Sequence, residues 1–442
     1  MDHIFQEEKF EENWFSYPKL YSRVVQRLNS GSKIVEIGSW KGKSSAYMAV
    51  EIANSTKDIE FYCVDTWEGS IEHTEEQKGH NLYNKFLDNM RPVENYYFPI
   101  KLNSIDASKK FKDNSLDFVF IDASHQYEDV KKDIISWLPK VKDGGIIAGH
   151  DYAESFPGVI QAADEVLGKE NIISSESCFI YYKNILNNFP SIRVISVTDS
   201  EQRRENLLRQ LKKYNITNIE FYIYNRYDNN KHNLSGSLLH RLSLDGRGPL
   251  TSHLKTIKSW LNDTNEQETF ICEDDLSIQT VKHWNFSWED FYKNIPKNWG
   301  IIQLTWTRER PGFFYFGNQF RNRCWCDWSA AGYLIKRSYA EKLIEQYYKD
   351  DTFHLQYSGK DAHLRNENFL VPTVETILFT DFDDPNNRVY SFPLFAEDVK
   401  NCDTTKPPEI GVSEHNIYSY EQTMNYWQSN PSIEDIFNKE NK

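Results

Sequence analysis

The chain has 442 residues and a formal net charge of −14, with 39% hydrophobic and 15% aromatic residues. This length is enough for about two or three domains with packed cores. The acidic excess argues against a protein that binds the phosphate backbone of nucleic acids. The sequence has no long apolar run and no secretory leader, and its six cysteines are scattered. We therefore expect a cytoplasmic protein without a membrane span.

The first strong pattern is an apolar run at residues 34–37, which contains Glu36 and is followed by Gly38 and Gly42. Two serines, Ser44 and Ser45, come next, and a helix-like stretch follows at residues 46–50. This order predicts a buried strand, a tight turn and the start of a helix. Such a turn brings the backbone close to a ligand and points helix N–H groups at it.

Three further apolar runs, at residues 61–65, 116–122 and 144–151, read as strands, and each ends in an acidic residue. Strands that alternate with helices predict a doubly wound parallel sheet. Ligands bind such a sheet at the carboxyl ends of its strands. We therefore expect the terminal acids to lie at a binding site; they are Asp65, Asp122 and Asp151.

On these patterns, residues 33–168 resemble the class I S-adenosylmethionine-dependent methyltransferases. They are most similar to the macrocin and mycinamicin sugar O-methyltransferases and the cephalosporin-hydroxylase-like proteins. The resemblance rests on four motifs: Glu36-x-Gly38-x-x-x-Gly42-x-Ser44, Asp65, Ile121-Asp122-x-x-His125-x-Tyr127, and Gly144-Gly145 followed by His150-Asp151. A nicotinamide-binding fingerprint would have a glycine where Trp40 stands.

The resemblance implies a site for S-adenosylmethionine. Glu36 would meet the amino end of the methionine, Asp65 would bind the ribose, and Trp67 would flank the adenine. Ser44 would lie near the cofactor carboxylate. The full predicted set is Glu36, Gly38, Ser39, Trp40, Gly42, Ser44, Asp65, Thr66, Trp67, Ser104 and Asp122.

Methyl transfer to an alcohol requires removal of a proton from a weak acid. Two carboxylates at strand ends, Asp122 and Asp151, would hold Mg²⁺, which lowers the pKa of a coordinated hydroxyl. His125 lies one helical turn past Asp122, so both should face the same pocket, and His125 would act as the general base beside Asp122. In the alternative interpretation, both aspartates cap helices and His125 is structural. An iron site with two histidines and one carboxylate is not evident.

A second α/β unit follows. Residues 192–197 form a predicted strand, Leu207 and Leu211 lie in a predicted helix, and residues 221–224 form another strand. We place the boundaries so that the methyltransferase domain covers 1–186, a second domain covers 187–380, and a C-terminal extension covers 381–442.

The acid run of this second domain, Glu273-Asp274-Asp275, directly follows an apolar strand at 269–272. Crowded carboxylates repel one another unless a cation neutralises them, and a hard divalent metal does so well. Such a metal can bridge the diphosphate of a sugar nucleotide. Upstream, residues 248–253 are predicted to open a helix that carries Ser252 and His253.

In this order of elements, residues 192–379 resemble the lipopolysaccharide-type glycosyltransferases of family twenty-five. The resemblance implies a GT-A-like α/β domain that uses a nucleotide-diphosphate sugar, with a uridine-diphosphate sugar expected, and Mn²⁺ or Mg²⁺ held by Asp275. Asp361 loosely matches an aspartate of that family that serves in catalysis or acceptor binding. The predicted nucleotide-sugar residues are Thr198, Arg203, Ser252, His253, Glu273, Asp274 and Asp275.

Together the two resemblances predict a bifunctional enzyme of polysaccharide, lipopolysaccharide or glycoprotein glycan synthesis. One domain would add a sugar from a nucleotide donor to a glycan acceptor, and the other would methylate a sugar hydroxyl. Two alternatives remain. Only one domain could be catalytic, with the other binding glycan, or the chain could be a scaffold. Whether it forms a homo-oligomer is open.

Overall fold

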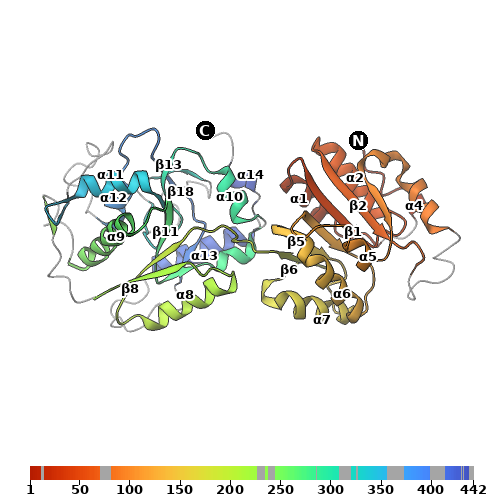
Figure 1. Cartoon of the computed structure of the whole chain (residues 1–442), viewed down its shortest axis with the longest axis horizontal. Helices are drawn as coiled ribbons and strands as arrows, with labels where there is room; N and C mark the ends of the chain where they lie inside the picture. Colours follow the sequence, from red (N-terminus) through yellow and green to blue (C-terminus); the bar gives the residue numbers. More distant parts are fainter. Residues whose placement is uncertain are drawn as a thin grey trace. The chain divides into compact units, whose positions relative to one another are not determined.

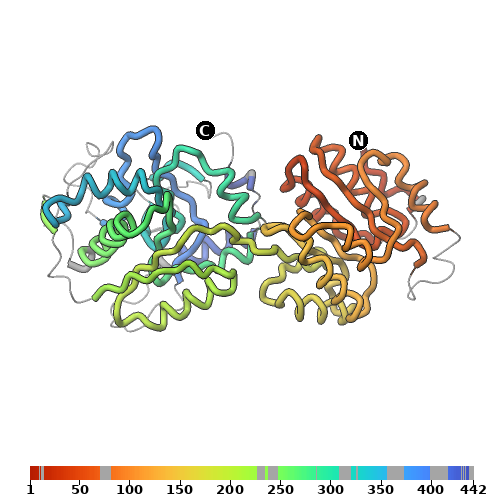
Figure 2. Tube along the Cα trace, viewed as in Figure 1, coloured from red at the N-terminus to blue at the C-terminus, as the bar shows by residue number. Residues whose placement is uncertain are grey.

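The computed structural model describes residues 1–10, 14–69, 81–225, 234–236, 244–284, 286–307, 320–324, 327–355, 373–398, 414–429, 431 and 433–437. These residues form two compact units (Figures 1 and 2). Unit 1 comprises Met1–Asn187 with Phe286–Trp288, and unit 2 comprises Asn188–Asn285 with Glu289–Lys442. Within the described residues, no helix combines the length and the apolar character that crossing a membrane requires.

Unit 1 is built on a seven-stranded sheet. Its strands, in spatial order, are β3 (Phe98–Lys101), β2 (Ile59–Asp65), β1 (Ser32–Ile37), β4 (Leu116–Ile121), β5 (Val141–Gly149), β7 (Cys178–Tyr182) and β6 (Ile173–Ser175). The first five strands are mutually parallel, as predicted. The last two are antiparallel, so the expectation of a wholly parallel sheet was wrong at this edge. The turn between β6 and β7 has positive φ at both Glu176 and Ser177, which suits a tight hairpin.

Helices cover both faces of this sheet, because successive side chains of each strand point to opposite faces (Figure 1). One core contains Ile34, Phe118 and Phe120 with the apolar sides of α1 (Pro18–Arg27), α2 (Lys43–Ser55) and α4 (Leu82–Met90). The other contains Val35, Val119 and Ile121 with α5 (Ser104–Ser108), α6 (Tyr127–Trp137) and α7 (Pro157–Ala163). Unit 1 therefore has the doubly wound, Rossmann-like architecture that the sequence predicts.

Unit 2 contains a second seven-stranded sheet. In spatial order its strands are β14 (Arg321–Asn322), β18 (Arg388–Ser391), β13 (Trp299–Gln303), β15 (Gly332–Lys336), β11 (Glu268–Glu273), β8 (Ile192–Val197) and β9 (Ile219–Tyr224). Strands β9, β8 and β11 are parallel, and β15 runs antiparallel to both β11 and β13. A short ribbon pairs β12 (Leu276–Ser277) with β19 (Ala396–Glu397), and a small sheet contains β10 (Leu234–Ser235), β17 (Thr352–His354) and β16 (Tyr348–Lys349).

The helices of this part of the chain are α8 (Glu201–Lys213), α9 (Leu244–Asp263), α10 (Trp288–Asn294), α11 (Arg337–Tyr347), α12 (Val374–Leu378), α13 (Glu414–Gln428) and α14 (Ile433–Ile436). The predicted start of α9 at Gly248 was wrong, since the helix is already formed at Leu244 and Pro249 lies inside it. Pro249 is the sixth residue of this helix, so it lacks an N–H that would otherwise pair with the carbonyl four residues earlier. The Ser252 hydroxyl donates to the Gly248 carbonyl at 2.9 Å, which helps to satisfy this part of the helix.

The predicted extension after residue 380 contributes directly to unit 2. Strand β18 lies between β14 and β13 in the large sheet, and β19 pairs with β12. Helix α13 buries Trp427, whose indole N–H donates to the Pro393 carbonyl at 3.0 Å. Burial alternates along the short strand β18, but Val389 is its one aliphatic residue, so the strand gave no recognisable signal in the sequence.

Candidate active sites

The loop between β1 and α2, residues 38–42, is shaped by its two glycines; we call it the cofactor loop. Gly38 has φ +90°, and a Cβ atom there would lie 1.8 Å from the carbonyl oxygen of Asp122. Gly42 also has φ +90°, caps α2, and faces the Met90 side chain. These conformations suit glycine alone. The close approach at Gly38 places the cofactor loop directly against the end of β4.

Glu36, on β1, stabilises the cofactor loop through a hydrogen bond with Ser39. Its side chain is only 1% exposed and accepts hydrogen bonds from the hydroxyls of Tyr21 and Ser39, both at 2.8 Å, and of Ser45. Burial raises the pKa of Glu36, and these hydroxyls, with that of Ser44, oppose the shift. A buried carboxylate ringed by hydroxyls fixes the loop conformation. Its predicted contact with the amino group of the cofactor stays a prediction.

Asp65 ends β2, at the neighbouring position along the sheet edge. Its Oδ2 accepts from the Trp40 amide at 2.8 Å, and its Oδ1 accepts from the Trp67 amide at 2.7 Å. Burial raises the pKa of Asp65, and the backbone donors oppose that effect. Each carboxylate oxygen has two lone pairs, so both oxygens retain acceptor capacity for a ribose hydroxyl. The half-buried Thr66 follows it directly.

Two predicted adenine contacts, Trp67 and Ser104, already have protein partners. Trp67 is buried, with ring centroids 4.7 Å from both Tyr83 and Phe86. Ser104 accepts a hydrogen bond from the Trp137 indole at 2.8 Å. Both side chains therefore contribute to packing between elements of unit 1, and their contact with adenine stays a prediction.

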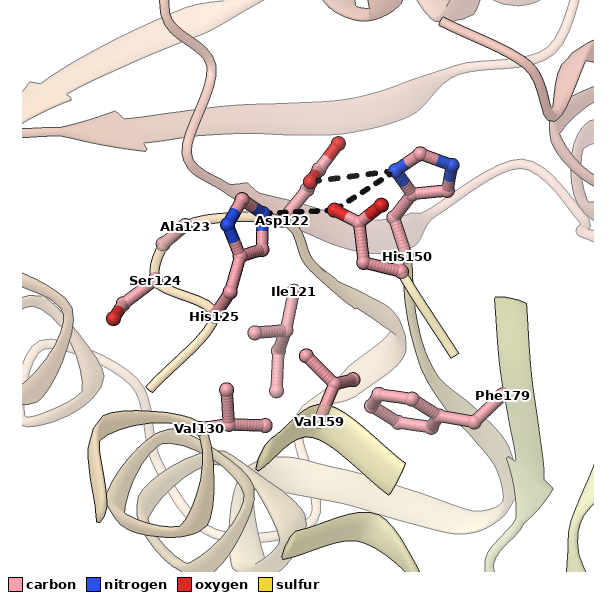
Figure 3. Close-up of a pocket in the computed structure, with 10 residues that line it drawn as sticks. Ile121, Asp122, Ala123, Ser124, His125, Val130, His150, Val159 and Phe179 are labelled. Carbon is pink, nitrogen blue, oxygen red and sulfur yellow. Dashed lines mark ion pairs between the residues drawn. The ribbon is translucent and has the colours of Figure 1, made fainter. Parts of the chain in front are cut away.

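The main polar cluster of unit 1 lies at the adjoining ends of β4 and β5; we call Asp122, His125, His150 and Asp151 the Asp–His cluster (Figure 3). One ligand atom each from Asp122, His125 and Asp151 lie within 4.8 Å of one another. His125 Nε2 is 2.8 Å from Asp151 Oδ2. His150 Nδ1 is 3.3 Å from the same oxygen and 3.7 Å from Asp122 Oδ1. The structure thus brings all four predicted side chains together.

The reason first offered for the closeness of Asp122 and His125 was wrong. The residues between them form a loop rather than a helical turn, and α6 begins only at Tyr127. The Ser124 hydroxyl stabilises this loop, because it accepts from the Gln126 amide at 3.2 Å. The two side chains converge because the loop folds back over the end of the sheet.

The aspartates and histidines of the Asp–His cluster shift one another's pKa values. Burial lowers the pKa of His150, but hydrogen bonds and charges from Asp122 and Asp151 outweigh it and raise the pKa to about 10. Burial raises the pKa of Asp151, but His125 and His150 outweigh this effect and hold it well below its usual range. The two carboxylates, Asp122 and Asp151, suit a hard divalent cation, and the His125 imidazole lies close enough to act beside it. The side chains present therefore fit the predicted metal.

A pocket adjoins the cluster, with the polar groups at one side and apolar side chains below them (Figure 3). Its lining comes from β4, β5, α6, α7 and β7 and consists of Ile121, Asp122, Ala123, Ser124, His125, Val130, His150, Asp151, Val159 and Phe179. An apolar floor beneath charged groups lowers the local dielectric and strengthens their mutual interaction.

Two residues of this site were missed by the sequence reasoning. The Tyr17 hydroxyl donates to Asp122 Oδ2 at 2.7 Å, and Ser16 Oγ lies 2.9 Å from His150 Nε2. The Tyr17 ring packs on the His150 ring, with centroids 4.7 Å apart. Burial and the charge of Asp122 raise the pKa of Tyr17 well above its ordinary value, so the phenol is a donor. Its four-residue spacing from Tyr21 was the available signal.

In unit 2 the acid run lies at the end of β11, as predicted, and Arg203 is paired with it. Arg203 Nε is 2.9 Å from Asp274 Oδ1, and its Nη2 contacts Asp275 Oδ2. The Ser196 hydroxyl donates to Asp274 Oδ2 at 2.6 Å. Arg203 was predicted to contact a sugar nucleotide, and here it neutralises part of the acid run.

One further carboxylate joins these acids from far along the chain. Glu397 lies on β19, whose pairing places it opposite Leu276, and the sequence analysis did not identify it. Burial raises the pKa of Asp275 to about 8; Arg203 opposes this shift, and the charges of Glu273 and Glu397 add to it. Burial likewise raises the pKa of Glu397. The crowding thus favours the protonated form of Asp275, or a cation in place of that proton.

His253 connects two of the predicted motifs of unit 2. It is fully buried, with Nε2 3.0 Å from Glu273 Oε1 and Nδ1 3.0 Å from the Tyr333 hydroxyl. A neutral imidazole can donate from Nε2 and accept at Nδ1, so the Tyr333 hydroxyl acts as donor in this arrangement. The predicted residue Thr198 is exposed after β8. Asp361 lies outside the described residues.

Residues 35–152 match the profile of a methyltransferase domain. This stretch runs from β1 past the end of β5 and contains both the cofactor loop and the Asp–His cluster. Unit 1 therefore contains an S-adenosylmethionine-dependent methyltransferase domain.

Among curated proteins, the uncharacterized protein y4gI of Sinorhizobium fredii (strain NBRC 101917 / NGR234) is similar to this chain. The two are 28% identical over 119 residues, which cover 27% of this chain and 13% of that protein. The chain thus spans only a small part of the length of this relative.

Several solved structures show distant similarity. The O-methyltransferase NovP is 16% identical, with a TM-score of 0.30, over 38% of this chain and 79% of its own. An S-adenosylmethionine-dependent O-methyltransferase of Thermotoga maritima is 16% identical, with a TM-score of 0.26, over 37% of this chain and 54% of its own. Aeropyrum pernix fibrillarin, bound to S-adenosyl-L-methionine, is 14% identical, with a TM-score of 0.25, over 37% of this chain and 73% of its own. Similarity at this level adds nothing to the family match.

Proposed function

We propose that unit 1 transfers a methyl group from S-adenosylmethionine to a sugar hydroxyl with the help of a divalent cation, for which we expect Mg²⁺. The observation that carries this proposal is the Asp–His cluster, whose Asp122, His125 and Asp151 ligand atoms lie within 4.8 Å of one another. Asp122 also adjoins the cofactor loop, because its carbonyl oxygen approaches Gly38. A hydroxyl held at the cluster would therefore lie beside the cofactor.

Each group of the cluster has a defined task in this proposal. A cation held by Asp122 and Asp151 would lower the pKa of the acceptor hydroxyl. His125 accepts the hydroxyl proton at Nδ1, because its Nε2, 2.8 Å from Asp151 Oδ2, donates to that carboxylate, and Asp151 stabilises the resulting imidazolium. Asp65 holds the cofactor ribose and the cofactor loop holds its methionine end. The Tyr17 ring and Ser16 keep His150 in place above Asp122.

Two measurements test this proposal. Calorimetry of the whole chain should detect binding of S-adenosylhomocysteine and of Mn²⁺, and labelled methyl transfer should be measured with a panel of sugars and glycans. Removal of metal with EDTA should abolish transfer, and Mg²⁺ or Mn²⁺ should restore it. Transfer that proceeds fully in EDTA would contradict the role of the cation. His125→Gln should lower transfer while it leaves Mn²⁺ affinity largely intact, which separates a base from a metal ligand.

A second candidate function concerns unit 2, which we propose is a glycosyltransferase of GT-A type that uses a nucleotide-diphosphate sugar, with a uridine-diphosphate sugar the first to test. The supporting observation is the acid run at the end of β11, beside a parallel β9–β8–β11 group. Asp275 would hold Mn²⁺ or Mg²⁺ against the diphosphate. His253 orients Glu273 through a hydrogen bond of 3.0 Å.

Under this proposal the chain acts on one glycan in two steps, glycosyl transfer and O-methylation, in polysaccharide, lipopolysaccharide or glycoprotein glycan synthesis. The alternative is that unit 2 only binds the glycan for unit 1. A panel of sugar nucleotides with Mn²⁺ separates the two. Turnover that is lost in Asp275→Asn supports the transferase, whereas glycan binding without sugar-nucleotide binding supports the alternative.

A further inference from the structure

Two tyrosines at the start of α1 each donate a hydrogen bond to a carboxylate of the candidate site. The Tyr17 hydroxyl donates to Asp122 Oδ2 at 2.7 Å, and the Tyr21 hydroxyl donates to Glu36 Oε1 at 2.8 Å. Tyr17 is the N-cap residue of α1, and Tyr21 lies inside the helix four residues later. Asp122 directly follows β4, and Glu36 lies on β1. These two strands are neighbours in the sheet.

Both tyrosines are held rigidly. Each side chain is at most 1% exposed, and the two ring centroids lie 5.2 Å apart. Both rings also pack on Phe120, at 4.5 and 5.1 Å. The start of α1 is tied down by the Leu20 amide, which donates to Glu176 Oε2 at 3.0 Å. Because the rings cannot move freely, their hydroxyls fix the positions of the two carboxylates.

The two carboxylates differ in what else they touch. Glu36 also accepts from Ser39 and Ser45, so its position determines the shape of the cofactor loop. Asp122 faces the Asp–His cluster through Oδ1, which is 3.7 Å from His150 Nδ1, while Tyr17 occupies Oδ2. One tyrosine therefore acts on the cofactor loop, and the other acts on the predicted cation site.

We propose that Tyr17 and Tyr21 are positioning residues with separate targets, Tyr17 orienting Asp122 for the cation and Tyr21 orienting Glu36 for the cofactor. The inference rests on the proposed function of unit 1. Partners that orient a metal ligand typically matter by about 10- to 100-fold in metal affinity. Helix α1 thus sets two binding sites independently through two hydroxyl groups.

The test compares Tyr17→Phe, Tyr21→Phe and a matched control, Tyr47→Phe, in the whole chain. Tyr47 lies on α2, and its hydroxyl hydrogen-bonds to Ser22 at 2.8 Å rather than to a carboxylate. Every chain compared also carries Asp275→Asn, which removes the other proposed cation ligand, and calorimetry gives its affinity for Mn²⁺ and, separately, for S-adenosylhomocysteine. Near-ultraviolet circular dichroism and thermal unfolding report whether each variant is folded.

We expect a crossed pattern. Tyr17→Phe should weaken Mn²⁺ binding by about tenfold or more and leave S-adenosylhomocysteine affinity within about twofold. Tyr21→Phe should weaken S-adenosylhomocysteine by roughly tenfold and leave Mn²⁺ within about twofold, since it removes a hydrogen bond to a buried charge. Tyr47→Phe should change neither affinity. In a double-mutant cycle, Tyr17→Phe should have little further effect on Mn²⁺ affinity once Asp122→Asn is present.

Three results would overturn the inference. In the first, Tyr17→Phe and Tyr21→Phe each lower the affinities for Mn²⁺ and S-adenosylhomocysteine equally. In the second, neither variant changes any affinity. In the third, one of these variants fails to fold, which would show a structural role for the hydroxyl. The proposed function fails in a different way: the unmodified chain would bind neither S-adenosylhomocysteine nor Mn²⁺, and the inference would then fall with it. An unmodified chain that binds only S-adenosylhomocysteine refutes the Tyr17 assignment.

Discussion

The two acidic sites of this chain neutralise their carboxylates in different ways. In unit 1, Asp122 and Asp151 face two histidines, His125 and His150, and a tyrosine hydroxyl. In unit 2, Asp274 and Asp275 face Arg203. A histidine can release its proton when a metal arrives, whereas an arginine stays charged at any ordinary pH. Under our proposal, a cation at unit 1 would therefore replace a proton, whereas a cation at unit 2 would bind beside a permanent positive charge.

The site of unit 1 depends first on the backbone at Gly38, which lets the cofactor loop approach Asp122 of the Asp–His cluster. Gly38→Ala should destabilise unit 1 by at least about 3 kcal/mol and abolish S-adenosylhomocysteine binding, because backbone strain of ~1–2 kcal/mol adds to a severe overlap with Asp122. Gly31→Ala is the matched control. Gly31 has φ +88° but no atom within 4 Å of the added carbon, so we expect strain alone. Urea unfolding of both variants measures the difference, and equal effects would contradict the close approach.

Removal of one charge from the Asp–His cluster separates the two sites. Asp122→Asn should weaken Mn²⁺ binding at unit 1 by roughly 100-fold or more, since even outer partners of a metal ligand matter by about 10- to 100-fold. Methyl transfer should fall with it, and sugar-nucleotide binding should be unchanged. Asp129→Asn, at an exposed position of α6, is the control. Paramagnetic resonance of Mn²⁺ measures the affinity of both variants for the ion. An unaltered affinity in Asp122→Asn would place the cation elsewhere.

In unit 2 the pH dependence of stability tests the crowding of the acids. The folded-state pKa of Asp275 is raised to about 8, above its unfolded value of about 3.9. The folded state therefore holds the proton more tightly, and the resulting stability is present at low pH and is lost as pH rises from about 4 to about 8. Asp275→Asn should remove this decline, and Mn²⁺ should reduce it in the unmodified chain.

Thermal unfolding followed across that pH window measures the effect, with Asp263→Asn, an exposed change on α9, as the control for the loss of one charge. A decline that persists unchanged in Asp275→Asn would assign it to another group.

The smallest expected effect is the proton exchange in unit 1. Because the pKa of His150 is raised to about 10, the imidazole carries a proton at neutral pH, and a nearby cation must compete with that charge. Mn²⁺ affinity should therefore rise with pH from neutral up to about pH 10, by at most about tenfold per pH unit, with protons released on binding. His150→Gln should flatten this dependence, and His3→Gln should not. Calorimetry in two buffers of different ionisation enthalpy measures the released protons.

The sequence identified local features well. Gly38, Gly42 and the acids at the ends of β2, β4, β5 and β11 each sit in a short motif whose chemistry can be read without the fold. Strands β1, β2, β4 and β5 of unit 1 were likewise predicted from the sequence, because each contains a nearly continuous apolar run.

Features that depend on contacts between residues far apart in the chain could not be predicted from the sequence. Tyr17 meets Asp122 across 105 positions of the chain, and Glu397 reaches the acid run only through the pairing of β19 with β12. The antiparallel hairpin of β6 and β7 follows from two residues with positive φ that are not glycine. In each case the decisive information lies in tertiary packing rather than in residue type or spacing.

The most direct test of the central claim is anomalous diffraction from crystals of the whole chain grown with S-adenosylhomocysteine and Mn²⁺. The account predicts a manganese peak bonded to Asp122 and Asp151, beside the cofactor loop. A fully occupied peak at Asp275 with none at the Asp–His cluster would contradict the account, because it would leave unit 1 without the cation on which its proposed chemistry depends.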